Sequence, residues 1–246
     1  MTPVRHLLRY PLKSHGREAV DRVVLIPGQS MPWDRVWAVA HEASKADGTK
    51  WVPYVNFSNV AKAPGLMAVT ASLDEATEML TLSHPLLADL SFHPDTEGDR
   101  LIEWVQPLAP KNRAQPDRVL RLDGRGFTDS EFPSVTLCNL ASHRAVEQQM
   151  GRDLSIHRWR GNIWFDGAEP WSEFDWIGHE VKIGGAVLRV EERTERCAAT
   201  TTDPDTGLRD ADTLAALGHW GHKDFSVRAR VIQGGPVTLS DTLELL

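Results

Sequence analysis

Val181-Lys182-Ile183-Gly184-Gly185-Ala186-Val187-Leu188-Arg189-Val190 is the stretch of this 246-residue chain that indicates its fold most clearly. Apolar residues alternate with polar ones on both sides of Gly184 and Gly185, and a Gly-Gly pair permits the positive φ angles of a tight two-residue turn. The pattern predicts a β-hairpin. Its second strand leads directly to the cysteine at position 197.

Strand-like runs recur on both sides of this hairpin, about ten residues apart, which is typical of a barrel or a sandwich. One helix is expected from the N-cap Asn139 to the stop at Gly151, and a short one over 211–217. The sequence therefore predicts a mainly β protein (β/α+β) with few helices. We expect further strands at 4–10, 19–26, 33–40, 66–71, 79–83, 88–92, 101–105, 118–122, 134–138, 225–232 and 242–245.

A proline-rich stretch over 106–117 has little hydrophobic pattern and carries three prolines. Such a stretch is typical of a linker or a crossover. We place a domain boundary at its start, with one domain over 1–105 and a second over 106–246.

Composition excludes several classes of protein. A formal net charge of −7 gives no general attraction for nucleic acid. The two cysteines, Cys138 and Cys197, are too far apart for a cysteine cluster or a disulfide scaffold, and a reducing, cytoplasmic compartment fits them best. No run approaches the roughly twenty apolar residues of a membrane span. We expect neither nucleic acid nor a membrane as a partner.

The most reactive side chain that the sequence offers is the thiol of Cys197. It lies in the stretch Arg196-Cys197-Ala198-Ala199-Thr200-Thr201-Thr202-Asp203-Pro204-Asp205-Thr206-Gly207. Charged residues precede Cys197, which indicates that it emerges near solvent or a cavity. The adjacent Arg196 favours its thiolate, the form that attacks electrophiles and binds soft metals. The Asp-Pro-Asp-Thr-Gly run predicts a tight turn. A small buried packing residue is the alternative for Cys197, and we interpret Cys138 as a core residue.

Basic side chains occur at three other places in the sequence. At each of them, one interpretation is that the side chain binds an anion. Lys13 lies on a loop, where it points into a site or into solvent. Arg35 is flanked by tryptophans, which indicates stacking or pairing with a buried anion. Arg158 and Arg160, close to Asn162, can grip phosphate through paired donors. The alternative is that these two arginines are solvated beside core tryptophans.

These motifs occur in the order seen in the MOSC-domain proteins, and the chain resembles that family over nearly its whole length. The family is named for the C-terminal domain of molybdenum cofactor sulfurase, and it includes the mitochondrial amidoxime reducing components and similar bacterial reductases of N-hydroxylated compounds. The resemblance implies an N-terminal MOSC β-barrel domain packed against a MOSC β-barrel domain. It rests on Tyr10-Pro11-Leu12-Lys13-Ser14, Asp34-Arg35-Val36-Trp37, Arg160-Gly161-Asn162-Ile163 and the stretch around Cys197.

The resemblance also implies roles for individual residues. Cys197 is similar to the thiolate ligand of molybdenum, whose other sulfurs come from the pterin dithiolene. Asp203 matches an acid near the metal, either as a proton donor or as a turn anchor, and a cofactor contact of Ser134 is left open. The positions that match cofactor-binding residues are Lys13, Arg35, Arg160, Asn162, Arg196, Thr200 and Thr201.

The function that the resemblance implies is reduction of small N-hydroxylated or N-oxide compounds, with the molybdenum cofactor (Mo-molybdopterin) as the redox group. The family is also associated with binding of pyridoxal phosphate. The sequence holds no Gly-rich dinucleotide fingerprint and no cysteine cluster. We therefore expect electrons from a separate ferredoxin-, flavodoxin- or cytochrome b5-like protein, docked through a local basic patch such as Arg158 and Arg160.

Two other functions stay open at this point. One is a cofactor-free thiol enzyme that uses Cys197 with a histidine as its base. The other is a carrier or binding protein that holds sulfur as a Cys197 persulfide, or stores the cofactor, without turnover.

Overall fold

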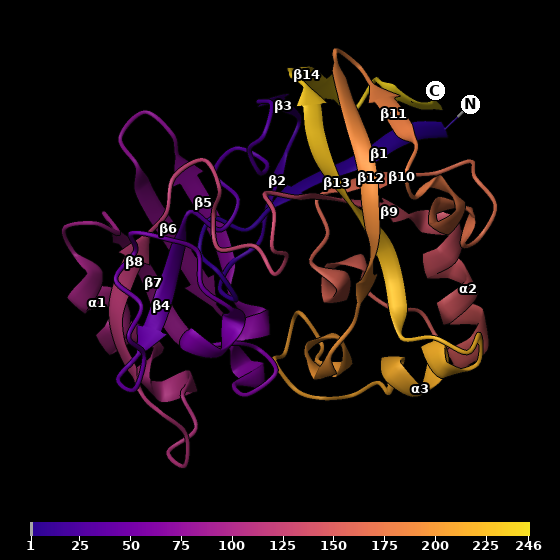
Figure 1. Cartoon of the computed structure of the whole chain (residues 1–246). Coiled ribbons are helices and arrows are strands. Elements are labelled where there is room, and N and C mark those ends of the chain that lie inside the picture. The colour runs from indigo at the N-terminus through magenta and orange to yellow at the C-terminus, as the bar shows by residue number, and fades with distance from the viewer. Residues whose placement is uncertain (1) are drawn as a thin grey trace.

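A closed β-barrel forms the larger lobe of the chain (Figure 1). The computed structural model describes residues 2–246. The barrel has seven strands in the order β10-β9-β13-β12-β11-β15-β1, and pairing of β1 with β10 closes it. β2 (Glu18–Val20) pairs with β1 outside this ring. The barrel strands are β1 (Thr2–Arg9), β9 (Val135–Asn139), β10 (Ile163–Phe165), β11 (Glu180–Ile183), β12 (Ala186–Glu195), β13 (Asp224–Gln233) and β15 (Thr242–Leu245).

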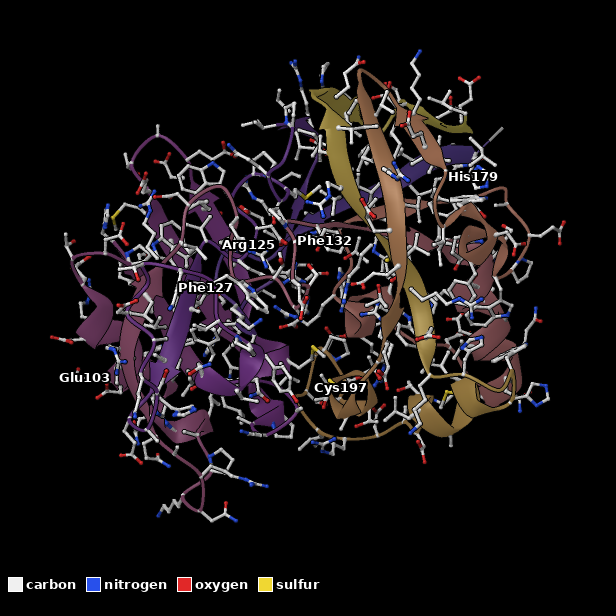
Figure 2. The ribbon with its side chains drawn as sticks, in the orientation of Figure 1. Glu103, Arg125, Phe127, Phe132, His179 and Cys197 are labelled. Atoms are coloured by element: carbon white, nitrogen blue, oxygen red, sulfur yellow. The ribbon has the colours of Figure 1, made fainter. Side chains whose placement is uncertain are left out.

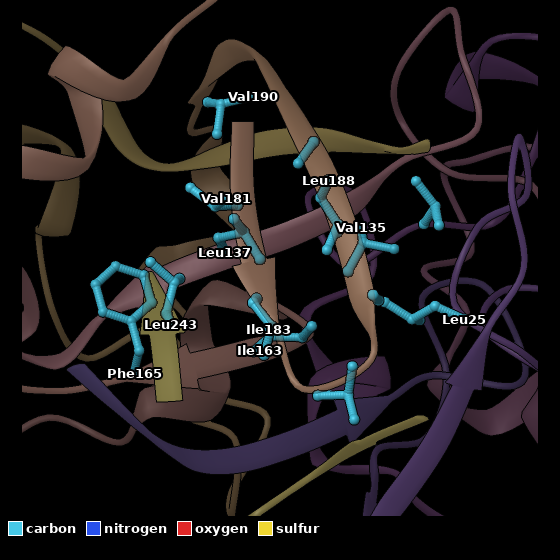
Figure 3. Close-up of a cluster of buried hydrophobic side chains, with 14 of the residues drawn as sticks. Leu25, Val135, Leu137, Ile163, Phe165, Val181, Ile183, Leu188, Val190 and Leu243 are labelled. Atoms are coloured by element: carbon cyan, nitrogen blue, oxygen red, sulfur yellow. The ribbon is translucent and has the colours of Figure 1, made fainter. Parts of the chain in front are cut away.

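The predicted hairpin at 181–190 is confirmed, since β11 and β12 pair antiparallel with Ile183 opposite Ala186. Successive side chains of a strand point to opposite faces, so the apolar members of both strands enter the barrel. Figure 3 shows Val181, Ile183, Leu188 and Val190 among the buried side chains of this core. Burying a side chain of this kind contributes about 1.5–3 kcal/mol. This core therefore holds the hairpin in place, and β12 continues beyond it to Glu195, two residues before Cys197.

The smaller lobe is built mainly from the first half of the chain. A three-stranded meander of β5 (Thr70–Asp74), β6 (Met79–His84) and β7 (Leu87–Phe92) packs near the pair β4 (Trp37–His41) and β8 (Pro116–Arg121). Buried Trp37, Leu82, Phe92 and Leu101 belong to its core. β3 (Arg22–Leu25) and β14 (Gly235–Thr238) form a separate two-stranded pair.

Helices are few, and the one predicted from its caps is confirmed. α2 (Leu140–Met150) begins after Asn139, whose side chain accepts from the Ala141 N–H, and ends at Gly151 with φ +64°. α3 (Thr213–Gly218) overlaps the helix expected over 211–217, and it begins two residues later and ends one residue later. The 3₁₀ turns are η1 (Tyr54–Asn56), η2 (Pro64–Ala68), η3 (Gln106–Leu108), η4 (Ile156–Trp159), η5 (Ser172–Trp176) and η6 (Ala198–Thr201). Among residues 2–246, no helix combines the length and the apolar character needed to cross a membrane.

Four expected strands are wrong in whole or in part. The strand expected at 19–26 is divided at Asp21 into β2 and β3, which pair with different strands. Residues 101–105 lie in the helix α1 (Gly98–Val105), where the buried Leu101 and Val105 are four residues apart on one helical face. Residues 66–68 lie in η2, so only the end of the expected strand at 66–71 is extended. The strand expected from residue 33 begins only at Trp37, because Trp33 and Arg35 have φ of +63° and +56°.

The expected domain boundary between residues 105 and 106 stays a prediction. Strand pairing crosses this boundary in both directions. β1, from the first part, closes the barrel of the second part, while β8, from the second part, pairs with β4. Each lobe therefore contains a strand from the other side of the expected boundary.

Candidate functional site

A cavity of about 520 Å³ is lined by residues of both lobes, and Cys197 is one of them. Figure 2 shows Cys197 where the chain leaves β12, on the side that faces the smaller lobe. The thiol-bearing residue is exposed, which excludes a purely packing role, whereas Cys138 is buried as expected. The cavity is strongly cationic, because its lining includes Lys13, Arg35, Arg158, Arg160, Arg196 and Arg228 against the acids Asp129 and Glu195.

The end of β12 turns Arg196 away from Cys197. The Arg196 guanidinium donates hydrogen bonds to the carbonyls of Trp159 (2.8 Å) and Phe225 (2.7 Å) and to the hydroxyl of Ser226 (2.6 Å). Burial lowers the pKa of Arg196 to about 10. Arg196 lines the cavity, but these hydrogen bonds use its guanidinium to fix the end of the strand that precedes Cys197.

The turn η6 holds the backbone of Cys197 from the other side. The Thr200 N–H donates to the Cys197 carbonyl at 3.2 Å, and the Thr200 hydroxyl lies 3.1 Å from the same oxygen. Thr200 lines the cavity, whereas Thr201 does not. The Thr201 hydroxyl bonds the Ala198 carbonyl at 2.8 Å, so it braces the turn.

Arg35 and Arg160 come together over the ring of Tyr10, and Lys13 lines the same cavity. The guanidinium carbons of Arg35 and Arg160 lie 4.9 and 4.3 Å from the centre of this ring. Arg35 donates to the carbonyl of Arg160 at 2.9 Å, and Arg160 has a left-handed backbone with φ +50°. Burial lowers the pKa of Arg160 to about 10. Among residues 2–246, its Nη2 is buried without a hydrogen-bond partner, so this end of the cavity lacks an acceptor.

Lys13 and Asp129 form an ion pair of 2.5 Å in the same cavity. The Lys13 amine also donates to the Phe127 carbonyl at 2.7 Å. Burial lowers the pKa of Lys13 and opposes ionisation of Asp129, but Lys13 and the arginines outweigh burial and lower the pKa of Asp129. The residues next to Asp129 do not indicate this pairing, because Lys13 is distant in the chain.

Asn162 lies outside the cavity lining. Its side-chain oxygen accepts from the Thr136 N–H at 3.0 Å, and its amide donates to the Leu8 carbonyl at 3.2 Å. These bonds tie the segment that carries Arg160 to β9 and β1. Asn162 therefore positions the segment that carries Arg160 without lining the cavity itself.

Asp203 also lies outside the cavity lining. One carboxylate oxygen accepts from the N–H groups of Asp205 (3.0 Å) and Thr206 (2.9 Å), and the other accepts from Arg158 (3.1 Å). These are the contacts of a turn anchor. Arg158 is itself buried, so the expectation that it forms part of a docking patch is wrong.

The turn that Asp203 anchors is bound to the smaller lobe. Arg209 donates to the Ala198 carbonyl at 2.9 Å and to the Ala61 carbonyl at 2.7 Å, across the two walls of the cavity. Gly207 packs against Gly65 so closely that a Cβ added to it would lie 2.8 Å from the Gly65 Cα. The glycine of the Asp-Pro-Asp-Thr-Gly run therefore permits both the turn and its contact.

Two further lining residues stand close to the cationic end. Arg228 lies on β13 between the buried Val227 and Ala229, so strand alternation places it on the other face. The alternation of apolar and polar residues in this strand is visible in the sequence. It could have identified Arg228 as a residue that points away from the barrel core. Ser134 also lines the cavity, and its hydroxyl lies 2.7 Å from that of Ser130. A contact of Ser134 with a cofactor stays a prediction.

No histidine lines the cavity in the part of the chain that the structure describes, and no hydrogen bond joins Cys197 to one. A thiol enzyme needs a base within hydrogen-bond reach of its nucleophile. The arrangement therefore gives no support to the cofactor-free thiol enzyme.

The fold and the cavity define a class: a two-lobed, mainly β protein with a single exposed thiol in a cationic cavity. The MOSC N-terminal beta barrel domain matches residues 1–119, and the MOSC domain matches residues 128–244. The chain belongs to the MOSC family.

Curated relatives are similar over about half of this chain. Mitochondrial amidoxime-reducing component 1 of Mus musculus is 29% identical over 111 residues, which cover 45% of this chain and 32% of that protein. Molybdenum cofactor sulfurase of Anopheles gambiae is 25% identical over 158 residues, which cover 54% of this chain and 19% of that protein. The matches thus span a third or less of each relative.

One solved structure is similar over the whole chain. The YuaD protein from Bacillus subtilis aligns with a TM-score of 0.50 and 13% identity, over 100% of this chain and 96% of that one. At this identity the likeness concerns the fold alone.

Proposed function

We propose that this chain is a molybdenum-cofactor oxidoreductase that reduces small N-hydroxylated or N-oxide compounds. The observation that carries the proposal is the placing of one exposed thiol, Cys197, in the same cavity as six lysine and arginine side chains. A thiolate is a soft ligand, which suits molybdenum, and a group of cations suits the phosphate of a pterin. The names of the relatives support the same chemistry.

The residues present fit such a cofactor. The partnerless Nη2 of Arg160 needs an acceptor, and a phosphate oxygen would provide one. Lys13, Arg35 and Arg160 would hold the phosphate, and Cys197 would bind the metal. When bound, the cofactor supplies a redox metal able to take the oxygen of an N–O bond.

The part of the cavity wall that includes Ala199 is largely apolar. Ala199 packs against the buried cluster that contains Val60, and Val60, Ala61 and Tyr54 line the cavity with it. An organic group attached to the reacting nitrogen would make apolar contact there. The cations at Tyr10 would remain available to the cofactor.

The proposal includes a separate electron donor of the ferredoxin, flavodoxin or cytochrome b5 type, and a cytoplasmic location. Reduction of an N–O bond consumes two electrons and two protons. The supporting observation is the composition of this chain, which has two cysteines far apart and no dinucleotide fingerprint.

Dye-coupled turnover tests the proposal. Purified protein from a cofactor-competent host receives an amidoxime and a reduced viologen dye, and the amidine product is measured together with bound molybdenum. We expect amidine formation in proportion to the molybdenum content, and none with metal-free protein. Molybdenum-loaded protein without turnover would contradict the reductase and favour a cofactor carrier. Cyanide-releasable sulfur on metal-free protein would favour a persulfide carrier.

A further inference from the structure

A second cavity, of about 260 Å³, lies in the smaller lobe. It is lined by His41 at the end of β4, by residues 57–59 and 62–63, and by residues 109, 110, 112–114 and 116. Asn59 lines both this cavity and the one that holds Cys197. The second cavity therefore adjoins the first, but all its other lining residues are different.

The charged groups of this cavity are cations. Lys62 and Arg113 line it together with the amide of Asn112, and no carboxylate is among the lining residues. Within residues 2–246, neither the Lys62 amine nor the Arg113 guanidinium has a hydrogen bond or an ion pair. By contrast, the nearby Arg118 is paired with Asp117. Both residues are exposed, and within residues 2–246 their cations face this cavity with no acid among its lining residues.

Both cations project from segments whose backbone is held in place. The Lys62 N–H donates to the Asn59 carbonyl at 3.1 Å and lies 3.2 Å from its side-chain oxygen. The side-chain amide of Gln115 donates to the carbonyls of Pro110 (3.1 Å) and Arg113 (2.5 Å), which closes the loop that carries Arg113. The side chains of Lys62 and Arg113 can therefore contact a ligand while the backbone that carries them stays in place.

We propose that this second cavity binds a phosphate-sized anion, either inorganic phosphate or the phosphoryl group of a small organic phosphate. Arginine presents a planar pair of donors that matches two phosphate oxygens, and lysine adds a compact charge for a third. The amide of Asn112 can donate to the same anion. The cavity volume suits a small molecule of this kind. The site uses none of the groups assigned to molybdenum or pterin binding.

His41 provides a local probe, because it lines this cavity and no histidine of the described residues lines the other one. The ring-proton NMR signals of His41, assigned with His41→Gln, are followed while inorganic phosphate is added to the full chain at constant pH. Sodium chloride of equal ionic strength serves as the blank. We expect a saturable shift with a dissociation constant in the millimolar range.

The double variant Lys62→Gln/Arg113→Gln should weaken this binding by about tenfold or more, since it removes both cations. The matched control is Lys45→Gln/Arg100→Gln, which removes the same charge from exposed positions outside the cavity. The control should keep the wild-type affinity.

Methyl phosphate distinguishes the two sources of the anion. Affinity equal to that of inorganic phosphate supports recognition of a phosphoryl group on an organic molecule, and weaker affinity supports the free anion. A phosphate titration without a saturable His41 shift would overturn the proposal. So would equal affinity in wild type and the Lys62→Gln/Arg113→Gln variant, or an equal loss in the control pair.

Discussion

Arg158 and Asp203 form an ion pair of 3.1 Å, in which Arg158 is buried and Asp203 anchors the turn after Cys197. The same guanidinium binds Asp210 at 2.8 Å. This pairing holds the Asp203 carboxylate against a buried guanidinium, and Asp203 itself does not line the cavity, although Arg158 does. Of the two roles considered for Asp203, the geometry favours that of a turn anchor over that of a proton donor.

The substitution Asp203→Asn should therefore affect stability more than catalysis. The amide oxygen can still accept from the turn N–H groups, but the charge-assisted bond to Arg158 is lost, at a cost of about 1–3 kcal/mol. Urea unfolding and the kcat of dye-coupled reduction measure the two effects, with the exposed Asp175→Asn as a control. A large fall in kcat at unchanged stability would assign Asp203 the role of a proton donor.

Arg160→Ala should loosen the pterin cofactor. Its guanidinium is buried at the cationic end of the cavity, and a charge-assisted bond to a partly buried phosphate contributes about 1.5–3 kcal/mol. The measurement is pterin retained after gel filtration. Arg144→Ala removes an arginine that pairs with Asp166 on the surface, and it should retain the wild-type amount. Equal retention in all three proteins would refute the role of Arg160.

Glu173 should make the stability of the fold depend on pH. It is fully buried, forms no ion pair among residues 2–246, and accepts hydrogen bonds from Asn139 and Ser142. Burial raises its pKa above the ordinary value. The folded state thus keeps the proton to a higher pH than the unfolded state, whose pKa is about 4.3.

Wild type should consequently lose stability relative to Glu173→Gln as the pH rises from about 4.3 through the folded pKa, and the difference should be constant above it. Urea unfolding of both proteins across this range measures the difference. A difference that does not change with pH would show that burial leaves the pKa of Glu173 unshifted.

Several elements could be predicted because their signals are local. The Gly184-Gly185 turn and its alternating flanks are enough for the hairpin, and Asn139 with Gly151 is enough for α2. The exposure of Cys197 followed from the charged residues before it. By contrast, residues 101–105 were assigned to a strand, since a short apolar run does not by itself distinguish a strand from a helix.

Contacts between distant parts of the chain could not be predicted in this way. Nothing near Asp129 indicates that Lys13, 116 residues earlier, is its partner. Closure of the barrel by β1 is likewise a tertiary pairing. The meeting of Lys13, Arg35 and Arg160 in one cavity was expected only from the family resemblance, and their roles there stay predictions.

The source of electrons gives a further prediction. This chain should not reduce an amidoxime with NADH or NADPH alone, because its sequence holds no dinucleotide fingerprint and no cysteine cluster to relay electrons. Product formation is compared with a pyridine nucleotide alone and with a reduced viologen dye, on the same molybdenum-loaded sample. Rapid turnover with NADH alone would contradict the need for a separate donor.

The central claim is that Cys197 binds molybdenum, and the metal content of two serine variants tests it most directly. Cys138→Ser changes a buried thiol in the core and should cost about 1–3 kcal/mol of stability while the molybdenum content is retained. Cys197→Ser changes an exposed thiol, so the fold should survive. A hydroxyl is a harder and far less acidic ligand, and bound molybdenum should fall by at least about tenfold. A folded Cys197→Ser protein with the wild-type amount of molybdenum would contradict the assignment.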